Sequence, residues 1–258
     1  MVRNVYKLCR IYFSIGKYLF NGQNDLEKFI ELAKEEDLYV LLRPGPFIDA
    51  ERDMGGLPFW LLQKYPNIKL RTSDASFLKH VNEWFSILFQ RMKPHLYING
   101  GPILMVQSEN EYGSYAKQTK NSDTIYLNHL QQMLRKHLGP EVFLYSTDGC
   151  SYQDVRGSKY PSVYSTVDFG PESDPEKCFA IQQLFEPGGP LVNSEYYPGW
   201  LDYWGKPHNK KSKEIVSKTL DKMLSMGANV NIYMMHGGTS FGFKVNNLIT
   251  YNSLIVCQ

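Results

Sequence analysis

Short apolar runs alternate along the chain with longer segments in which apolar residues recur every three or four positions. The runs are apolar on both faces, which is typical of strands buried in a parallel sheet. They predict strands at residues 39–42, 103–107, 142–146, 163–167, 191–195 and 230–235. Because helical segments separate most of these strands, the pattern predicts an α/β fold with helices packed outside a parallel sheet.

The helical segments have recognisable beginnings and ends. A first helix is expected to begin at Asn24, because Glu27 follows three residues later in a capping-box pattern. A long helix is expected to begin at Ser73 and to stop before Pro94. Its apolar stripe consists of Phe77, Val81, Trp84, Phe85, Leu88 and Met92. Further helices are expected at residues 125–138 and 215–226, each followed by a glycine.

The ends of the predicted strands repeatedly carry polar, aromatic or glycine-rich residues. That arrangement is the signature of a (β/α)8 barrel, whose active site lies at the carboxyl ends of its strands. A complete barrel has eight strands, and the pattern contains six. The fold class predicted is therefore an incomplete (β/α)8 TIM barrel, with about six of the eight β/α units and two lacking at its start.

Two of these strand ends carry glutamates. Glu109, Asn110 and Glu111 follow the strand at 103–107, and Glu195 lies at the end of a strand three places further on. In a closed barrel these ends converge over one pocket. Paired carboxylates suit glycoside hydrolysis, because one protonates the leaving oxygen while the other attacks the anomeric carbon. A separation of about 5 Å predicts retention of configuration, and a wider one predicts inversion.

Side chains beside the two glutamates are candidates for binding a sugar. Asn110 is expected to hydrogen-bond a sugar hydroxyl, and Tyr233 is expected to position the attacking carboxylate. Aromatic residues make up 14% of the chain, and their flat faces suit sugar rings as well as core packing. Candidates for stacking, with packing as the alternative for each, are Trp60, Trp200 and Trp204.

Composition excludes several other classes of function. The net charge is +2 and the basic residues are scattered, so no nucleic-acid partner is predicted. No apolar run approaches the roughly 18 residues of a membrane span. The four cysteines are Cys9, Cys150, Cys178 and Cys257. They lie far apart without a CxxC pair, which argues against a metal site and leaves disulfides and free thiols equally open. No cofactor is predicted.

Long motifs follow one another in a fixed order along the chain. They include Arg43-Pro44-Gly45-Pro46-Phe47-Ile48, Met54-Gly55-Gly56-Leu57-Pro58, Asn99-Gly100-Gly101-Pro102, Glu109-Asn110-Glu111-Tyr112-Gly113-Ser114-Tyr115, Thr147-Asp148-Gly149, Thr166-Val167-Asp168-Phe169-Gly170, Asn193-Ser194-Glu195 and Gly237-Gly238-Thr239. In these motifs the chain resembles the β-galactosidases of glycoside hydrolase family 35, of the animal lysosomal acid type. The resemblance covers about residues 18–243.

The resemblance implies a metal-free (β/α)8 enzyme that releases terminal β-galactose from glycolipids and glycans by a retaining mechanism. By motif position, Glu111 is similar to the acid/base and Glu195 to the nucleophile. The positions implied to contact galactose are Ile48, Ala50, Glu51, Asn110 and Tyr233. Asp49 departs from the family, which has a sugar-contacting cysteine there. We expect the Asp49 carboxylate to bind a sugar hydroxyl or to repel the nucleophile.

Both ends of the chain depart from the family pattern. The predicted organisation is an atypical segment at 1–17, a partial catalytic barrel at 18–243 and an atypical tail at 244–258. Residues 1–17 carry basic residues and a short apolar stretch without a small-residue cleavage site, so a signal peptide is not predicted. The resemblance nevertheless implies a lysosomal or secreted protein. The sequence predicts no particular oligomeric state.

The incomplete barrel leaves three readings of function open. The leading one is a β-galactosidase barrel whose activity as residues 1–258 alone is weak or absent. The second is a carbohydrate-binding or non-functional fragment of such an enzyme, without catalysis. The third is a related hydrolase that uses the same carboxylate pair on another sugar.

Overall fold

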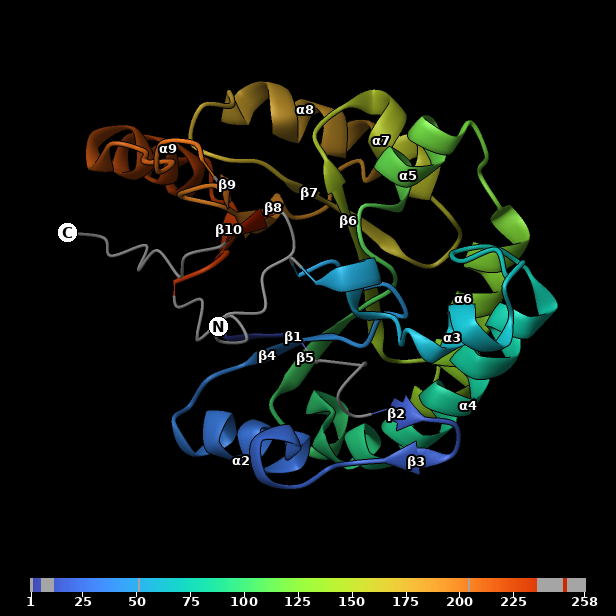
Figure 1. The fold of residues 1–258 in the computed structure, drawn as a ribbon. Helices are drawn as coiled ribbons and strands as arrows, with labels where there is room; N and C mark the ends of the chain where they lie inside the picture. Colours follow the sequence, from blue (N-terminus) through green and yellow to red (C-terminus); the bar gives the residue numbers. More distant parts are fainter. Residues whose placement is uncertain (1, 6–11, 51, 204, 236–247, 250–258) are drawn as a thin grey trace.

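A curved sheet of seven parallel strands forms the centre of the molecule (Figure 1). The computed structural model describes residues 2–5, 12–50, 52–203, 205–235 and 248–249. The strands in spatial order are β1 (Val2–Val5), β4 (Val40–Arg43), β5 (Ile103–Gln107), β6 (Phe143–Gly149), β7 (Tyr164–Asp168), β8 (Val192–Tyr196) and β10 (Asn229–Ile232). Every neighbouring pair is parallel, and β1 and β10 form the two edges of the described sheet.

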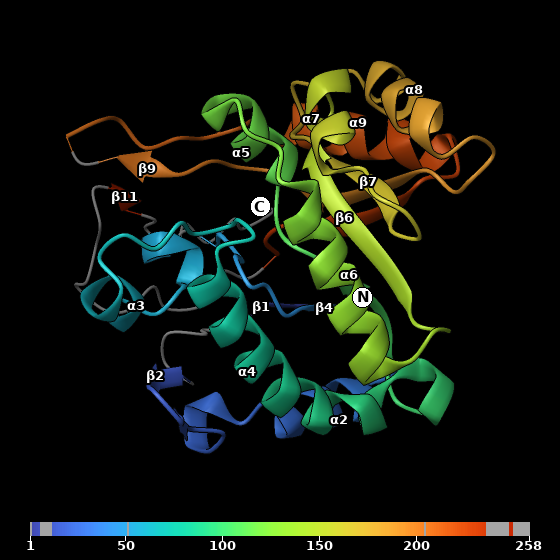
Figure 2. The ribbon, with the colours of Figure 1, turned by 90° about the vertical axis from the view of Figure 1, so that its right-hand side faces the viewer.

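Helices cover the outer side of the curved sheet (Figure 1 and Figure 2). They are α2 (Leu26–Glu35), α3 (Trp60–Lys64), α4 (Ala75–Met92), α5 (Tyr112–Thr119), α6 (Thr124–Leu138), α7 (Tyr152–Ser158), α8 (Pro175–Phe185) and α9 (Lys213–Ser225). Two small antiparallel pairs join β2 (Tyr12–Ser14) to β3 (Lys17–Tyr18) and β9 (Asp202–Tyr203) to β11 (Leu248–Ile249). The arrangement confirms the predicted fold class, an incomplete (β/α)8 barrel.

All six predicted strands are present, and a seventh lies where none was predicted. The additional strand is β1, which pairs in register with β4 from Val2 opposite Val40 to Val5 opposite Arg43. Its two central residues, Arg3 and Asn4, are polar, so it lacks the continuous apolar run that marks the other buried strands. The last predicted strand ends earlier than expected, because β10 stops at Ile232 and a turn follows.

Two helices begin one or two residues later than predicted, because an aspartate caps each of them. The carboxylate of Asp25 accepts a hydrogen bond from the Lys28 amide at the start of α2, so Asn24 is not the cap. The carboxylate of Asp74, rather than the Ser73 hydroxyl, accepts from the first free amides of α4. An Asp carboxylate at the N-cap also carries a charge that favours the helix dipole.

The main core lies between α4, α6 and the strands β4 and β5, with α4 and α6 side by side (Figure 2). All six residues of the predicted α4 stripe are buried. Facing them from α6 are the buried residues Tyr126, Leu127, Leu130, Leu134 and Leu138. On α2, Leu26, Ile30 and Ala33 are buried, whereas Phe29 is 40% exposed.

A second, smaller core packs β7 and β8 against α8 and α9. A disulfide between Cys150 and Cys178 joins the end of β6 to α8 across this unit. It shows that two of the four cysteines are paired with each other, while Cys9 and Cys257 lie outside the described residues. The disulfide closes a segment with a sequence separation of 28 and holds α8 over the sheet next to the strand ends.

The α4 core makes a first prediction about stability. Phe89 is fully buried and its ring centre lies 4.7 Å from that of Phe85, so Phe89→Ala is expected to lower the unfolding free energy by about 3–5 kcal/mol. The neighbouring exposed residue supplies the control, and Gln90→Ala is expected to change it by less than about 0.5 kcal/mol. Urea denaturation followed by circular dichroism measures both. Equal losses in the two variants would contradict the assignment of this core.

Candidate active site

The chain leaves β5 in a strained conformation that ends the strand before the predicted acidic motif. Glu109 and Glu111 have φ values of 63° and 44°, in the left-handed region that non-glycine residues rarely adopt. The Glu111 amide still donates to the Thr147 carbonyl of β6, so the motif runs on along the edge of the neighbouring strand. Such strain concentrates at functional sites, because surrounding contacts must hold it in place.

Arg43, the last residue of β4, connects the two predicted catalytic glutamates. Its side chain is 2% exposed, and its Nη2 lies 3.1 Å from Glu195 Oε1. The same nitrogen donates to the side-chain oxygen of Asn110 and, at 3.0 Å, to the carbonyl of Ile48. Asn110 Nδ2 lies 3.5 Å from Glu111 Oε2. One buried guanidinium therefore brings Glu195, Asn110 and Glu111 into a single cluster.

A register shift in β8 explains how Glu195 faces this cluster. Val167 of β7 is opposite Asn193, yet the next residue, Asp168, is opposite Glu195. The extra residue Ser194 is a β-bulge, a feature that re-aims side chains near active sites. Residues opposite each other on neighbouring strands share a face of the sheet, so Glu195 lies beside Asp168.

The electrostatic surroundings of Glu111 favour its protonated form. Burial raises the pKa of Glu111 to about 7, and the negative charges of Glu195 and Asp49 act in the same direction. The cations Arg43 and Arg71 oppose that shift without cancelling it. A carboxyl group with such a pKa holds its proton in mildly acidic solution and can still release it to a leaving group.

The loop after β4 brings two further predicted residues, Ile48 and Asp49, to the cluster. Asp49 and Ala50 both have left-handed backbone conformations, with φ values of 54° and 56°. Burial, followed by the charge of Glu195, raises the pKa of Asp49. Ile48 contributes its carbonyl, whereas its side chain is buried in the core. Glu51 lies outside the described residues.

Tyr233 is also held at the cluster. Its amide donates to the Tyr196 carbonyl of β8 at 2.8 Å. Its ring centre lies 5.7 Å from the guanidinium carbon of Arg43, a cation–π distance. The ring therefore packs against the cation that contacts Glu195.

The tryptophans proposed for sugar stacking fall into different environments. Trp60 packs edge-on against the rings of Tyr12 and His80, and its indole nitrogen donates to the Tyr12 carbonyl, which is a packing role. Trp200 is 50% exposed, and its ring centre lies 5.3 Å from that of Tyr197. Trp204 lies outside the described residues.

The other carboxylate of the acidic motif, Glu109, pairs with an arginine outside the cluster. Glu109 is buried, and Arg71 Nη2 lies 2.8 Å from its Oε2. The hydroxyl of Tyr126 donates to Glu109 Oε1 at 2.5 Å. Arg71 also donates to the Asn110 carbonyl at 2.6 Å, so this ion pair holds the backbone of the motif in place. Spacing alone did not distinguish Glu109 from Glu111.

One residue beside the cluster, Tyr197, was not singled out by the sequence pattern. Burial, reinforced by the charges of Asp168 and the two glutamates, raises the pKa of Tyr197. A Cβ at Gly170 would lie 2.8 Å from the Tyr197 ring, so the glycine of the Asp168–Gly170 motif allows that ring to approach. The position of Tyr197 two residues after Glu195, on the same strand end, was the available signal.

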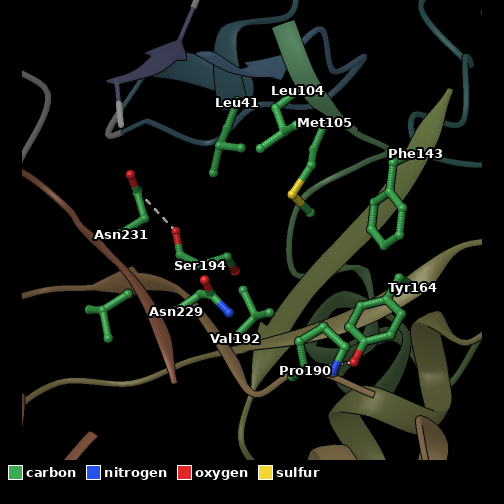
Figure 3. A pocket seen from close by; sticks show the side chains of 11 residues that line it. Leu41, Leu104, Met105, Phe143, Tyr164, Pro190, Val192, Ser194, Asn229 and Asn231 are labelled. Carbon is green, nitrogen blue, oxygen red and sulfur yellow. Dashed lines mark hydrogen bonds between the residues drawn. The ribbon is translucent and has the colours of Figure 1, made fainter. Parts of the chain in front are cut away.

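A cavity of about 260 Å³ lies away from this cluster, towards the amino ends of the strands (Figure 3). Its walls come from six strands and the segment before β8, and they include Leu41, Phe143, Tyr164, Val192 and Asn229. None of the predicted site residues lines it. The cavity is therefore distinct from the carboxyl-end cluster, which is where (β/α)8 enzymes hold their substrates.

The described part of the chain lacks two other kinds of feature. No group of three or more His, Cys, Asp or Glu side chains in it is placed to hold a metal ion. Within the same residues, no helix is long and apolar enough to cross a membrane.

Comparison with solved structures defines the class of fold. An exo-β-1,4-mannosidase from Opitutaceae bacterium strain TAV5 superimposes with a TM-score of 0.62, covering 90% of this chain and 44% of that one at 15% identity. A β-galactosidase from the haloarchaeon Halorubrum lacusprofundi gives a TM-score of 0.59, covering 90% and 48% at 11% identity. The fold is that of the TIM-barrel glycosidases.

Comparison of sequences identifies the family. The model of glycosyl hydrolases family 35 matches residues 12–254, and the chain belongs to that family. It is 50% identical over 228 residues to the β-galactosidase of Felis catus. The aligned region covers 88% of this chain and 33% of the cat protein. The β-galactosidase-1-like protein of Mus musculus is also 50% identical, with 88% and 34% covered. The chain thus spans about a third of the length of these relatives.

The pKa of Glu111 predicts how stability depends on pH. Because the folded-state pKa of about 7 exceeds the ordinary value of 4.5, folding favours the protonated form. The resulting stabilisation is complete below about pH 4.5 and is lost as the pH rises through about 7. We expect the unfolding free energy of the wild type, minus that of Glu111→Gln, to fall across this range.

Urea unfolding at a series of pH values measures this difference. Exposed Glu141 provides a matched control, and Glu141→Gln is expected to retain the pH dependence of the wild type. If the unfolding free energy of the wild type minus that of Glu111→Gln stays constant or grows with pH, Glu111 does not hold a proton in the folded protein.

Proposed function

We propose that the chain carries part of the catalytic barrel of a β-galactosidase, which releases terminal non-reducing β-galactose with retention of configuration. The observation that carries this proposal is the single cluster in which Arg43 and Asn110 connect Glu111 with Glu195. Membership of family 35 and the names of the similar cat and mouse proteins support it. The mechanism is a double displacement.

In the first displacement, a Glu195 carboxylate oxygen forms a bond to the anomeric carbon of galactose. The bond from that carbon to the leaving oxygen breaks, and Glu111 gives this oxygen its proton. The cation of Arg43, 3.1 Å from Glu195, stabilises the carboxylate before attack. The raised pKa of Glu111, about 7, keeps the acid protonated until it is used.

In the second displacement, Glu111 is ionised and acts as a base. It accepts a proton from a water molecule, whose oxygen attacks the anomeric carbon and breaks the ester bond to Glu195. Galactose leaves, Glu195 regains its carboxylate, and Glu111 regains its proton. Inverting configuration twice gives net retention.

The neighbouring residues supply binding to the sugar. Asn110 is held by Arg43 and Gln107, which leaves its amide group directed towards Glu111 for a hydroxyl of the substrate. Tyr233 flanks Arg43 on the other side. We assign further contacts to the loop that carries Ile48, Asp49, Ala50 and Glu51. Asp49, close enough to Glu195 for its pKa to respond, is proposed to bind a hydroxyl.

We also propose the bounds of the catalytic unit, its substrate and its place of action. Residues 18–243 are the proposed catalytic unit, flanked by atypical segments at 1–17 and 244–258. The substrate is a β-galactoside of a glycolipid or glycan, without a nucleic-acid partner. The proposed place of action is the lysosome or the cell exterior, and the Cys150–Cys178 disulfide supports an oxidising compartment.

An assay of residues 1–258 with a fluorogenic β-galactoside tests the catalytic assignment. We expect slower turnover than that of a full-length relative, because the described sheet has open edges at β1 and β10. Glu195→Gln is expected to abolish the residual rate, since its amide cannot form the ester. The control Glu141→Gln, at an exposed position, is expected to keep it.

The same experiment separates the alternatives. Galactose binding that survives Glu195→Gln, with no hydrolysis in either form, would instead identify a carbohydrate-binding fragment. Faster hydrolysis of another glycoside would identify a hydrolase for a different sugar. Turnover equal to that of a full-length relative would show that this part of the barrel is sufficient.

A 2-deoxy-2-fluoro-β-galactoside with a good leaving group tests the nucleophile directly. Fluorine at C2 slows hydrolysis of the ester more than its formation, so the galactosyl enzyme is expected to accumulate. Mass spectrometry of peptides should find the added sugar on Glu195 in the wild type and on no residue in Glu195→Gln. A label on any other carboxylate would transfer the role of nucleophile to that residue.

A further inference from the structure

A row of buried hydroxyl groups crosses three neighbouring strands beneath the proposed catalytic pair. Thr147 Oγ1 of β6 lies 3.1 Å from Asp168 Oδ2 and 2.5 Å from Ser194 Oγ. Ser194 Oγ lies 2.7 Å from Thr166 Oγ1, which lies 2.7 Å from the carbonyl oxygen of Ser146. All four side chains are at most 2% exposed. The row thus begins at a carboxyl group and ends at a backbone carbonyl.

Counting hydrogens fixes the direction of this row. Its four contacts need four hydrogens, and three hydroxyl groups supply only three. The Ser146 carbonyl can only accept, so Thr166 donates to it. Ser194 must then donate to Thr166, and Thr147 to Ser194. If Thr147 donates to an ionised Asp168 instead, one of the two short hydroxyl–hydroxyl contacts is left without a hydrogen, whereas a protonated Asp168 supplies the fourth hydrogen.

A weaker contact does not relieve the shortage. Ser194 Oγ also lies 3.4 Å from the Val167 carbonyl, which is another group that only accepts. That contact would draw on the same three hydroxyl hydrogens. It raises the number of hydrogens that the row needs, so it does not remove the reason for a protonated Asp168.

We propose that Asp168 is a protonated, neutral carboxyl group held by this row, and that it is a positioning residue which leaves Glu195 as the charged nucleophile. The role rests on the proposed function, whereas the position of the proton does not. Asp168 is directly opposite Glu195 in the strand register, and its strand lies between those of Glu111 and Glu195. An ionised Asp168 would place two buried negative charges side by side, which costs several kcal/mol.

The charges around Asp168 favour the same protonation state. Among the described residues, Arg71 pairs with Glu109 and Arg43 with Glu195, but no cation forms an ion pair with Asp168. After burial, the groups that most strongly raise the pKa of Asp168 are the acidic residues Glu111, Glu195 and Asp148 from three different segments, while the hydrogen bond with Thr147 acts in the opposite direction.

Burial and these three charges raise the pKa of Asp168 well above its ordinary range. Tyr197, whose own pKa is raised partly by Asp168, brings no positive charge. The hydrogen count and the electrostatic surroundings are independent observations, and they agree on a neutral Asp168.

Infrared difference spectroscopy of the full chain tests the protonation state without requiring hydrolysis. The Glu111→Gln background removes the other expected protonated carboxyl of the pair. At pH 8 we expect carbonyl-stretching absorption of protonated carboxyl groups that shifts in D2O and loses one component in Asp168→Asn, while any component from buried Asp148, whose pKa is also raised, remains. A spectrum of the background without such a band, or one unchanged by Asp168→Asn, would overturn the proposal.

A second variant covers the case in which Asp168→Asn does not fold. Ser194→Ala removes the acceptor of the Thr147 hydrogen, so Thr147 can donate to an ionised Asp168. The Asp168 component is then expected to titrate away at lower pH than in the parent. Ser165→Ala is the matched control, because this buried β7 hydroxyl lies outside the row and is expected to leave that component unchanged. Identical titration in the Ser194 and Ser165 variants would contradict the proposed row.

The titration of Glu111, followed by carbon-13 NMR, tests the positioning role. If Asp168 is neutral, Asp168→Asn replaces one neutral group with another and the midpoint of Glu111 does not move. Glu195→Gln removes a negative charge and is expected to lower that midpoint. A comparable fall in Asp168→Asn would mean that Asp168 is charged and would overturn the role. Failure of galactoside hydrolysis alone would refute only the proposed function.

Discussion

A single buried cation, Arg43, is the constraint on which the proposed active site depends. Three carboxyl groups, Asp49, Glu111 and Glu195, act on one another at the carboxyl ends of the strands. Burying such a group without compensation would be prohibitive. Arg43 contacts one carboxylate directly and reaches a second through Asn110. Because Arg43 is the last residue of β4, the sheet fixes where its positive charge lies relative to these carboxyl groups.

The buried carboxylates do not all have an arginine partner, and this difference distinguishes the proposed roles of the acidic groups. Glu109 and Glu195 each have an arginine partner, while among the described residues the side-chain partner of Glu111 is an amide at 3.5 Å. Carboxylates that lack a cation in a buried site retain their protons more strongly. A division between one charged and one protonated carboxyl therefore follows from which of these glutamates has an arginine partner.

The hydrophobic pattern predicted the strands and the α4 stripe because burial on one or both faces leaves a periodic signal. The resemblance located Glu111 and Glu195. Contacts between distant residues left no comparable signal, so the Arg71–Glu109 pair and the place of Asp168 needed coordinates. The same holds for β1, which is recognisable only by its pairing with β4. Spacing could not indicate which cysteines pair.

The Cys150–Cys178 bond has a bearing on how the site is assembled. The loop it closes contains β7 and Asp168, whereas Glu111 and Glu195 lie outside it. Cross-linking a loop with a sequence separation of 28 reduces the entropy of the unfolded chain, a contribution of about 3.6 kcal/mol in the chain-entropy model. Under reducing conditions, the segment between Glu111 and Glu195 would be held by the pairing of β7 with β6 and β8 and by packing, without the covalent link. The redox environment therefore affects the stability of the proposed active site.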